Sequence, residues 1–167
     1  EFLPFLYPNQ YVNFSPDSEA SKLALSMVSE DTSDIDALKQ IYNYVVNNLT
    51  YDYDKAETVE TGYLPDVDET LSTKTGICFD YAALTTAMLR SCDIPCKLQI
   101  GYTGDIKHAW IDVYIRSKGW VTGAVSFNGD SWSLMDPTFD SSADSDDTEA
   151  IQDYIGNADN YTVQFTR

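Results

Sequence analysis

The sequence contains a single histidine, His108, among its 167 residues. Histidine is the side chain whose ordinary pKa lies closest to neutral pH, so His108 is the leading candidate for any side-chain proton shuttle. One histidine cannot supply the usual ligand sets of a zinc site, and no pair of cysteines has zinc-type spacing. We therefore predict no structural metal and no other cofactor. A calcium site at the acidic stretch PDVDET, residues 65–70, is an open alternative, although no EF-hand pattern is present.

Basic residues are scarce. The chain has ten Lys and Arg residues and 27 Asp and Glu residues, which gives a formal net charge of −17. This excess opposes binding to phosphate backbones and anionic lipid, so we expect no nucleic-acid partner. It is typical of a solvated surface, and it also fits attraction for cationic substrates or a place at a cell surface. No apolar run approaches the ~20 residues that a membrane-spanning helix needs, so we expect no such segment.

The three cysteines are an odd number, which argues against a disulfide framework. A bridge between Cys92 and Cys96 is an open alternative, and it would leave Cys78 free. Without that bridge, Cys92 and Cys96 fit the role of small packing residues. Cys92 lies about four helical turns beyond Cys78, and Cys96 opens a strand directly after a proline.

The length suits one domain, residues 1–167, with enough chain to bury a sizeable core. Residues 1–15 carry two prolines and five aromatic residues, and we predict an extended arm over the domain surface. Ser15-Pro16 resembles an N-cap followed by a first-turn proline, which predicts a helix to about Ser29. A second helix is predicted from a capping box at Ser33 to about Asn48, and residues 50–75 have no clean period and predict a long loop.

The stretch GICFDYAALTTAMLRS, residues 76–91, predicts a third helix, which ends before Pro95 because the residue before proline avoids the α region. Four predicted strands, separated by glycine-bearing turns, follow at Cys96–Tyr102, His108–Ile115, Trp120–Phe127 and Ser131–Asp136. Residues 141–167 predict an acidic loop, a short helix near 148–155 and a last strand. Helices first and strands after favour an α+β fold with an antiparallel sheet.

Cys78 stands at the predicted start of the third helix, two residues after Gly76, which permits an unusual backbone angle and a close approach. A thiol in the first turn lies near unpaired N–H groups and the positive end of the helix dipole, which favour the thiolate. The negative charge of Asp80 opposes this, but at two residues' offset it points to another face and we expect a small effect. The alternative is a buried packing cysteine.

His108 begins a strand whose alternation places Trp110 on the same face, where its ring could shield the imidazole from water. Asp136 precedes a proline that holds it in an extended conformation. Taken singly, His108 is explained as a satisfied surface or core group and Asp136 as a turn opener. Together with Cys78 they form the set that thiol catalysis needs, since the imidazole pairs with the thiolate and a carboxylate holds the imidazole's tautomer.

Several linked motifs resemble the core of the transglutaminase-like superfamily, in its bacterial type, over roughly residues 35–140. The matching stretches are Ile41-Tyr42, Leu49-Thr50-Tyr51-Asp52, Gly76-Ile77-Cys78, Leu89-Arg90, Ile94-Pro95, Gly101-Tyr102, His108-Ala109-Trp110 and Asp136-Pro137-Thr138. The resemblance implies a papain-related fold, with N-terminal helices and the nucleophile helix packed on an antiparallel sheet. It also implies a Cys78-His108-Asp136 triad.

Members of this superfamily include protein cross-linkers, peptidases, amidases and catalytically inactive modules. Animal-type transglutaminases carry a tryptophan upstream of the cysteine that helps to form the oxyanion site. Here all three tryptophans lie downstream, so Tyr51 is the aromatic residue predicted in a similar role, with Trp110 as a second substrate-binding residue.

We therefore predict a thiol-dependent acyl-transfer enzyme that acts on peptide or side-chain amide bonds through a thioester, and that is hydrolytic rather than cross-linking. The alternative is an inactive binding or spacer module of a surface protein. The expected partner is a protein or peptide substrate, such as a cell-wall peptide. The resemblance, together with a chain that begins at Glu1 without a methionine, predicts an extracellular or cell-surface location.

Overall fold

A computed structural model describes residues 2–60, 62–103, 106–128, 131–134 and 162–167, with side chains described at 2–60, 62–101, 109–125 and 166–167. The helices are η1 (Leu3–Phe5, a 3-10 helix), α1 (Glu19–Met27), α2 (Asp34–Asn48), α3 (Tyr53–Thr58), α4 (Val67–Thr73) and α5 (Cys78–Ser91). The strands are β1 (Thr50–Tyr51), β2 (Thr75–Gly76), β3 (Cys96–Thr103), β4 (Ile106–Ile115), β5 (Gly119–Asn128), β6 (Ser131–Leu134) and β7 (Thr162–Thr166).

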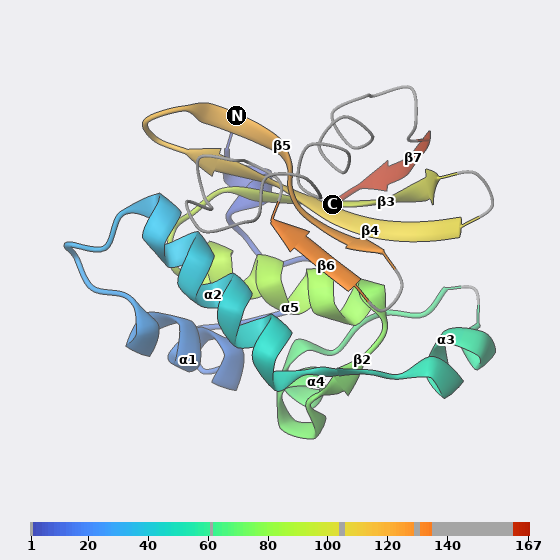
Figure 1. Cartoon of the computed structure of the whole chain (residues 1–167). Coiled ribbons are helices and arrows are strands. Elements are labelled where there is room, and N and C mark those ends of the chain that lie inside the picture. The colour runs from blue at the N-terminus through green and yellow to red at the C-terminus, as the bar shows by residue number, and fades with distance from the viewer. Residues whose placement is uncertain (1, 61, 104–105, 129–130, 135–161) are drawn as a thin grey trace.

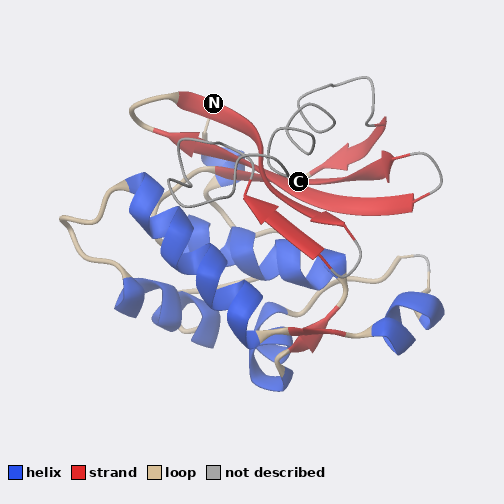
Figure 2. Cartoon of the chain, in the orientation of Figure 1, coloured by secondary structure: helices blue, strands red, loops and turns tan. Residues whose placement is uncertain are grey.

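Strands β3 to β7 form one five-stranded antiparallel sheet in the order β6-β5-β4-β3-β7. Helices α1, α2, α4 and α5 lie together on one side of this sheet (Figure 1), so helices and strands form two layers (Figure 2). β1 and β2 form a separate parallel pair. The predicted α+β fold, with the helix that carries Cys78 packed on an antiparallel sheet, is confirmed.

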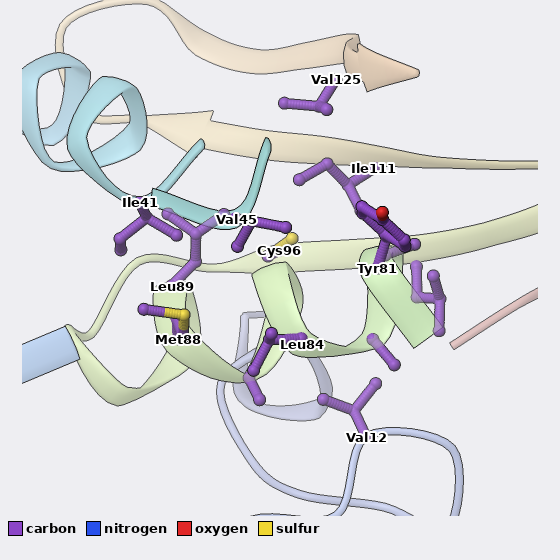
Figure 3. Close-up of a cluster of buried hydrophobic side chains, with 14 of the residues drawn as sticks. Val12, Ile41, Val45, Tyr81, Leu84, Met88, Leu89, Cys96, Ile111 and Val125 are labelled. Atoms are coloured by element: carbon purple, nitrogen blue, oxygen red, sulfur yellow. The ribbon is translucent and has the colours of Figure 1, made fainter. Parts of the chain in front are cut away.

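Helix α5 is the centre of the core. Every residue from Cys78 to Arg90 is buried, and the helix contacts α1, α2 and α4 as well as β3, β4 and β5. Apolar residues such as Phe79, Leu84 and Met88 are spread along the helix, and a helix that is buried on all sides is stable only when other elements surround it. Figure 3 shows side chains of α5 among those of α2, the sheet and the N-terminal segment; the labelled ones are Val12, Ile41, Val45, Tyr81, Leu84, Met88, Leu89, Cys96, Ile111 and Val125.

The alternation predicted for the strand that begins near His108 is present in β4. Ala109, Ile111, Val113 and Ile115 are at most 1% exposed and belong to the core. Asp112, on the opposite face, lies where the register with β5 shifts, which marks a β-bulge. Its carboxylate accepts hydrogen bonds from Gly123 N (2.8 Å) and Gln99 Nε2 (2.9 Å). These bonds tie β3, β4 and β5 together on the side of the sheet away from α5.

Arg90 anchors the C-terminal end of α5. Its side chain is buried, and it donates to Cys96 O from Nε (3.1 Å) and Nη2 (2.7 Å) and to Tyr7 O from Nη1 (2.9 Å). Val12 is fully buried in the same core. The prediction of an extended surface arm over residues 1–15 is wrong at Leu3–Phe5, which form a 3-10 helix. Most of the described residues of the segment are exposed, and Arg90 and the buried Val12 side chain hold it against the domain.

The start of the first predicted helix is also wrong, because Ser15 forms a turn rather than an N-cap. Ser18 N donates to Ser15 O (3.0 Å), Asp17 N donates to Ser15 Oγ (3.2 Å), and α1 begins only at Glu19 with Ser18 as its N-cap residue. The second predicted helix is confirmed. Ser33 Oγ accepts a hydrogen bond from the backbone N–H of Asp36, the third residue of α2, and the helix ends at Asn48.

The long loop predicted over residues 50–75 instead contains β1, α3, α4 and β2. The two helices are too short for an apolar period, but each starts at an aspartate that caps it. Asp52 Oδ1 accepts from Lys55 N (3.0 Å), and Asp66 Oδ1 accepts from the N–H groups of Asp68 (3.1 Å) and Glu69 (3.0 Å). Asp68 Oδ1 accepts from a backbone N–H of α1. The acidic stretch left open as a calcium site thus uses two of its carboxylates to fix helices.

The predicted strands are confirmed to within two residues where they are described. β6 is described to Leu134, and β7 corresponds to the predicted last strand. The predicted acidic loop and the predicted helix near 148–155 lie outside the described residues. The longest described helix, α2, has 15 residues, and no helix in the described ranges has the length and apolar character to cross a membrane.

We predict that Arg90→Met lowers the free energy of unfolding by about 2–4 kcal/mol, because the buried carbonyl of Cys96 and the partly buried carbonyl of Tyr7 lose a charged donor. Urea denaturation followed by circular dichroism measures the change. Arg116→Ala is the matched control, since the Arg116 side chain is 76% exposed and pairs with Asp34 at 3.4 Å. Its loss should stay within about 0.5 kcal/mol. Equal losses in the two variants would show that Arg90 does not anchor the core.

Candidate active site

Cys78 is the first residue of α5, as the sequence predicts, and a two-stranded pair leads the chain into it. β1 and β2 are parallel, with Tyr51 opposite Gly76, and Asp52 N donates to Gly76 O (2.9 Å). Ile77 is the extended N-cap residue. Cys78 is 9% exposed. Tyr51 therefore lies beside the turn that carries the cysteine, although 27 residues separate them in the sequence.

Asp80, the third residue of α5, fixes this turn from inside the protein. Its side chain is fully buried, and its Oδ2 accepts from Ile77 N (2.9 Å). This is the acidic half of a capping box; the Ile77 side chain has no acceptor for the other half. The carboxylate therefore holds the backbone immediately before Cys78.

Two further side chains bind the Asp80 carboxylate, and both come from the segment predicted as a loop. Tyr63 donates its hydroxyl hydrogen to Asp80 Oδ1 (2.5 Å), and Lys55 Nζ lies 2.9 Å from Asp80 Oδ2. Lys55 Nζ also donates to the Tyr63 hydroxyl (2.5 Å) and lies 4.4 Å from the centre of its ring. Sequence reasoning missed Lys55 and Tyr63; the acidic residue at the third helix position was the only local sign that a buried network begins here.

The electrostatics of this network favour a charged lysine and a neutral tyrosine. Burial, followed by the hydrogen bond to Asp80, raises the pKa of Tyr63 to about 12. Burial of Lys55 works against its charged form, but its hydrogen bonds to Tyr63 and Asp80 outweigh that cost and raise its pKa above the ordinary value. Lys55 thus carries a positive charge at neutral pH, directly against the Asp80 carboxylate.

Gly76 is needed for close approach rather than for an unusual backbone angle. A Cβ at this position would lie 2.6 Å from Asp80 Cβ and 3.0 Å from Asp80 Oδ2. Gly76 is not among the described residues with positive φ. The part of the prediction that invoked a special angle is therefore wrong, and the packing of Asp80 under the turn is the physical reason for glycine.

Tyrosine rings line the other side of the turn. The Tyr51 ring lies 4.9 Å from that of Tyr53 and 6.5 Å from that of Tyr81, measured between centroids. Tyr53 is 59% exposed, whereas Tyr81 is buried and burial raises its pKa to about 12. An aromatic wall thus runs from the surface to the first turn of α5.

The remaining predicted site residues are placed only in part. The backbone of His108 belongs to β4 and pairs with Gly101 on β3. His108 is the third residue of β4, and in Figure 1 both β4 and α5 run from right to left. Trp110 is 6% exposed and pairs with Gln99. The side chain of His108 and the whole of Asp136 lie outside the described residues. The described part of β6 ends two residues before Asp136, and β5 separates β6 from β4.

The other two cysteines have the packing role that the sequence favours. All three cysteines are free thiols, so the open Cys92–Cys96 bridge is not formed. Burial raises the pKa of Cys92 to about 11 and that of Cys96 to about 12. Cys96 is fully buried and donates its S–H to Thr86 Oγ1 (3.6 Å). Among the described residues, no group of three or more His, Cys, Asp or Glu side chains is arranged to hold a metal ion.

Comparison with known proteins assigns the fold to a family. The model of the transglutaminase-like superfamily matches residues 21–137, which is most of the chain. YebA, an uncharacterised protein of Bacillus subtilis, is 27% identical over 141 residues, covering 71% of this chain and 19% of YebA. The mouse Kyphoscoliosis peptidase is 24% identical over 136 residues, covering 74% of this chain and 18% of the relative.

The chain thus spans about a fifth of the length of the curated relatives that it matches. The crystal structure of a candidate cysteine protease from Cytophaga hutchinsonii aligns with a TM-score of 0.57 at 19% identity, covering 99% of this chain and 54% of that one. At this identity the likeness concerns the fold alone. The family match, with the helix that begins at Cys78 packed on an antiparallel sheet, shows that the chain belongs to the transglutaminase-like superfamily.

Proposed function

We propose that this domain is a thiol-dependent acyl-transfer enzyme in which Cys78 is the nucleophile, His108 the acid and base, and Asp136 the group that orients His108. The observation that carries the proposal is the position of Cys78 at the first residue of a helix buried along its whole length, in a chain of this superfamily. A thiol at a helix N-terminus faces N–H groups that have no carbonyl partner inside the helix, and these favour the thiolate.

The proposed reaction proceeds in two steps. The Cys78 thiolate attacks the carbonyl carbon of a peptide or side-chain amide, a C–S bond forms, and the carbonyl π electrons move to oxygen. When the tetrahedral intermediate collapses, the C–N bond breaks and His108 gives its proton to the departing amine. His108 then takes a proton from water, the hydroxide attacks the thioester, and the C–S bond breaks to release a carboxylic acid and the thiolate.

The negative oxygen of each tetrahedral intermediate needs donors. The backbone N–H of Cys78 is one, because it stands at the first helix position. Tyr51 supplies the second in this proposal. Its backbone pairs with Gly76, and its ring stands in the aromatic wall beside the first turn of α5.

We favour water over an amine as the acceptor. No tryptophan precedes Cys78 in the sequence, whereas animal-type transglutaminases use one upstream of the cysteine. The mouse relative is named a peptidase, which is consistent with hydrolysis. The proposed substrate is a protein or peptide outside the cell, such as a cell-wall peptide.

We predict that iodoacetamide at about pH 6 labels Cys78 rapidly, because a free thiol of pKa ~8.5 is nearly inert at that pH whereas a thiolate paired with imidazolium is not. Peptide mapping by mass spectrometry gives the rate at each cysteine. Cys92 is an internal control, since it is more exposed than Cys78 but its pKa is raised to about 11. Rapid labelling at Cys78 should disappear in His108→Ala, because the chain has no second histidine.

Labelling of Cys78 no faster than that of a free thiol would contradict the catalytic proposal and would favour the inactive module. The same rate in His108→Ala as in the unmodified protein would exclude His108 as the partner of the thiolate.

We predict that Tyr51→Phe slows acylation of Cys78 by p-nitrophenyl acetate about tenfold or more, because one oxyanion donor is lost. Release of p-nitrophenolate measures the rate. Alkylation by iodoacetamide forms no oxyanion, so its rate should not change in this variant. Tyr53→Phe is the matched control, since Tyr53 is the exposed neighbour of Tyr51 in the aromatic wall. Unchanged acylation in Tyr51→Phe would exclude the hydroxyl of Tyr51 from the oxyanion site.

A further inference from the structure

Asp80 carries a buried negative charge at a position where it should destabilise a thiolate at Cys78. Its side chain is 0% exposed, and it stands in the first turn of α5, two residues after Cys78. A carboxylate at this distance disfavours a neighbouring thiolate, and it also competes for the positive end of the helix dipole. From the sequence, we expect only a small destabilisation of the thiolate, because Asp80 points to another face of the helix. Direction alone does not remove a charge effect inside a protein, where screening is weak.

The structure supplies a specific counter-charge. Lys55 Nζ lies 2.9 Å from Asp80 Oδ2 and 2.5 Å from the Tyr63 hydroxyl, which in turn donates to Asp80 Oδ1. The Lys55 side chain is 32% exposed, so the pair has its negative member inside and its positive member at the boundary with solvent. The Asp80 carboxylate thereby has three partners, one from the backbone of Ile77, one from α3 and one from the segment before α4.

We propose that Lys55 and Asp80 are positioning residues for the Cys78 thiolate: Asp80 fixes the turn at Ile77, and Lys55 neutralises Asp80 so that this anchor does not destabilise the thiolate. The inference rests on the proposed role of Cys78 as the nucleophile. Neither residue touches the substrate in this scheme; both act through the backbone and the local field.

A purely structural role predicts something different. An ion pair that only holds α3 against α5 contributes little net stability, and the loss of either partner would loosen the turn. A charge-balancing role predicts effects of opposite sign on the thiolate. Among the described residues, the other titratable side chains next to this turn are Tyr51, Tyr53 and Tyr81 in the aromatic wall and Asp52 at the start of α3. His108 belongs to the proposed triad and is left unchanged with them. None of them is altered in the variants below.

The test is a double-mutant cycle read out as the pH midpoint of Cys78 alkylation by iodoacetamide, with the label located by mass spectrometry. Lys55→Met leaves the carboxylate unpaired, so the midpoint should rise by about 0.5–1 pH unit. Asp80→Asn keeps an oxygen acceptor for Ile77 N but leaves the lysine charge unpaired, so the midpoint should fall by a similar amount. The double variant should return to within about 0.3 pH unit of the starting protein.

Two controls separate charge from packing. Lys55→Arg keeps the positive charge and should leave the midpoint close to that of the starting protein. Lys22→Met removes a lysine of the exposed Lys22–Glu19 pair, whose side chains are 57% and 71% exposed, and should leave the midpoint unchanged. Thermal unfolding of each variant shows whether the fold is retained.

Shifts of the same sign in Lys55→Met and Asp80→Asn, or no shift in either, would overturn the proposal. If Asp80→Asn does not fold, equal midpoints in Lys55→Met and Lys55→Arg overturn it instead. This result is distinct from failure of the proposed function. A Cys78 that reacts like a free thiol at pH 6 in the starting protein rejects the nucleophile, while the signs of the shifts still report whether Lys55 and Asp80 balance the charge beside it.

Discussion

The burial of α5 on all sides is the constraint on which the rest of this structure depends. A 14-residue helix that is buried from its first residue to Arg90 must be enclosed by other elements, and helices α1, α2 and α4 on one side and the sheet on the other provide the enclosure. The enclosure fixes the helix in place along its length. A side chain at either end is then held by the whole core rather than by its own turn, which is the condition for precise placement of Cys78.

Both ends of α5 carry a buried charge, and both charges are satisfied by groups from distant parts of the chain. At the C-terminal end, Arg90 donates to carbonyl oxygens of β3 and of the N-terminal segment. At the N-terminal end, Asp80 accepts from Ile77 N, Tyr63 and Lys55. An unpaired buried charge costs several kcal/mol. The helix is therefore stable only when the segments that pair with Arg90 and Asp80 are folded against it. The N-terminal segment and α3 are thus attached to the core by polar contacts as well as by apolar side chains such as Val12 and Ala56.

The elements that could be predicted from the sequence are those with a strong local signal. The apolar run after Cys78, the period of α2 with its cap at Ser33, and the alternation of β4 each specify their own structure, and all three were found. The segment between α2 and β2 was missed because its helices are too short to show a period and begin at aspartate caps, Asp52 and Asp66. Likewise, no local pattern could show that Lys55 and Tyr63 bind Asp80, since such contacts exist only once three separate elements have been packed together. The grouping of Cys78 with His108 and Asp136 follows from the residue types that thiol catalysis needs and from the family resemblance, and it stays a prediction, because the side chain of His108 and the whole of Asp136 lie outside the described residues.

The segment of residues 50–75, which was predicted as a loop, also supplies the neighbours of Cys78 outside α5. There is a physical reason why a segment that is hard to predict lies at this place. A residue outside α5 that lies near Cys78 has to come from a segment that folds against the start of this helix. β1 does so by pairing Tyr51 with Gly76, and α3 does so through Lys55. Gly76 leaves room for the Asp80 side chain that Lys55 contacts, because a Cβ at position 76 would occupy the space of Asp80. A short strand of two residues and a helix of six are not stable alone. Their conformation is set by tertiary contacts with α5, so the environment of Cys78 and the structure of this segment are determined together.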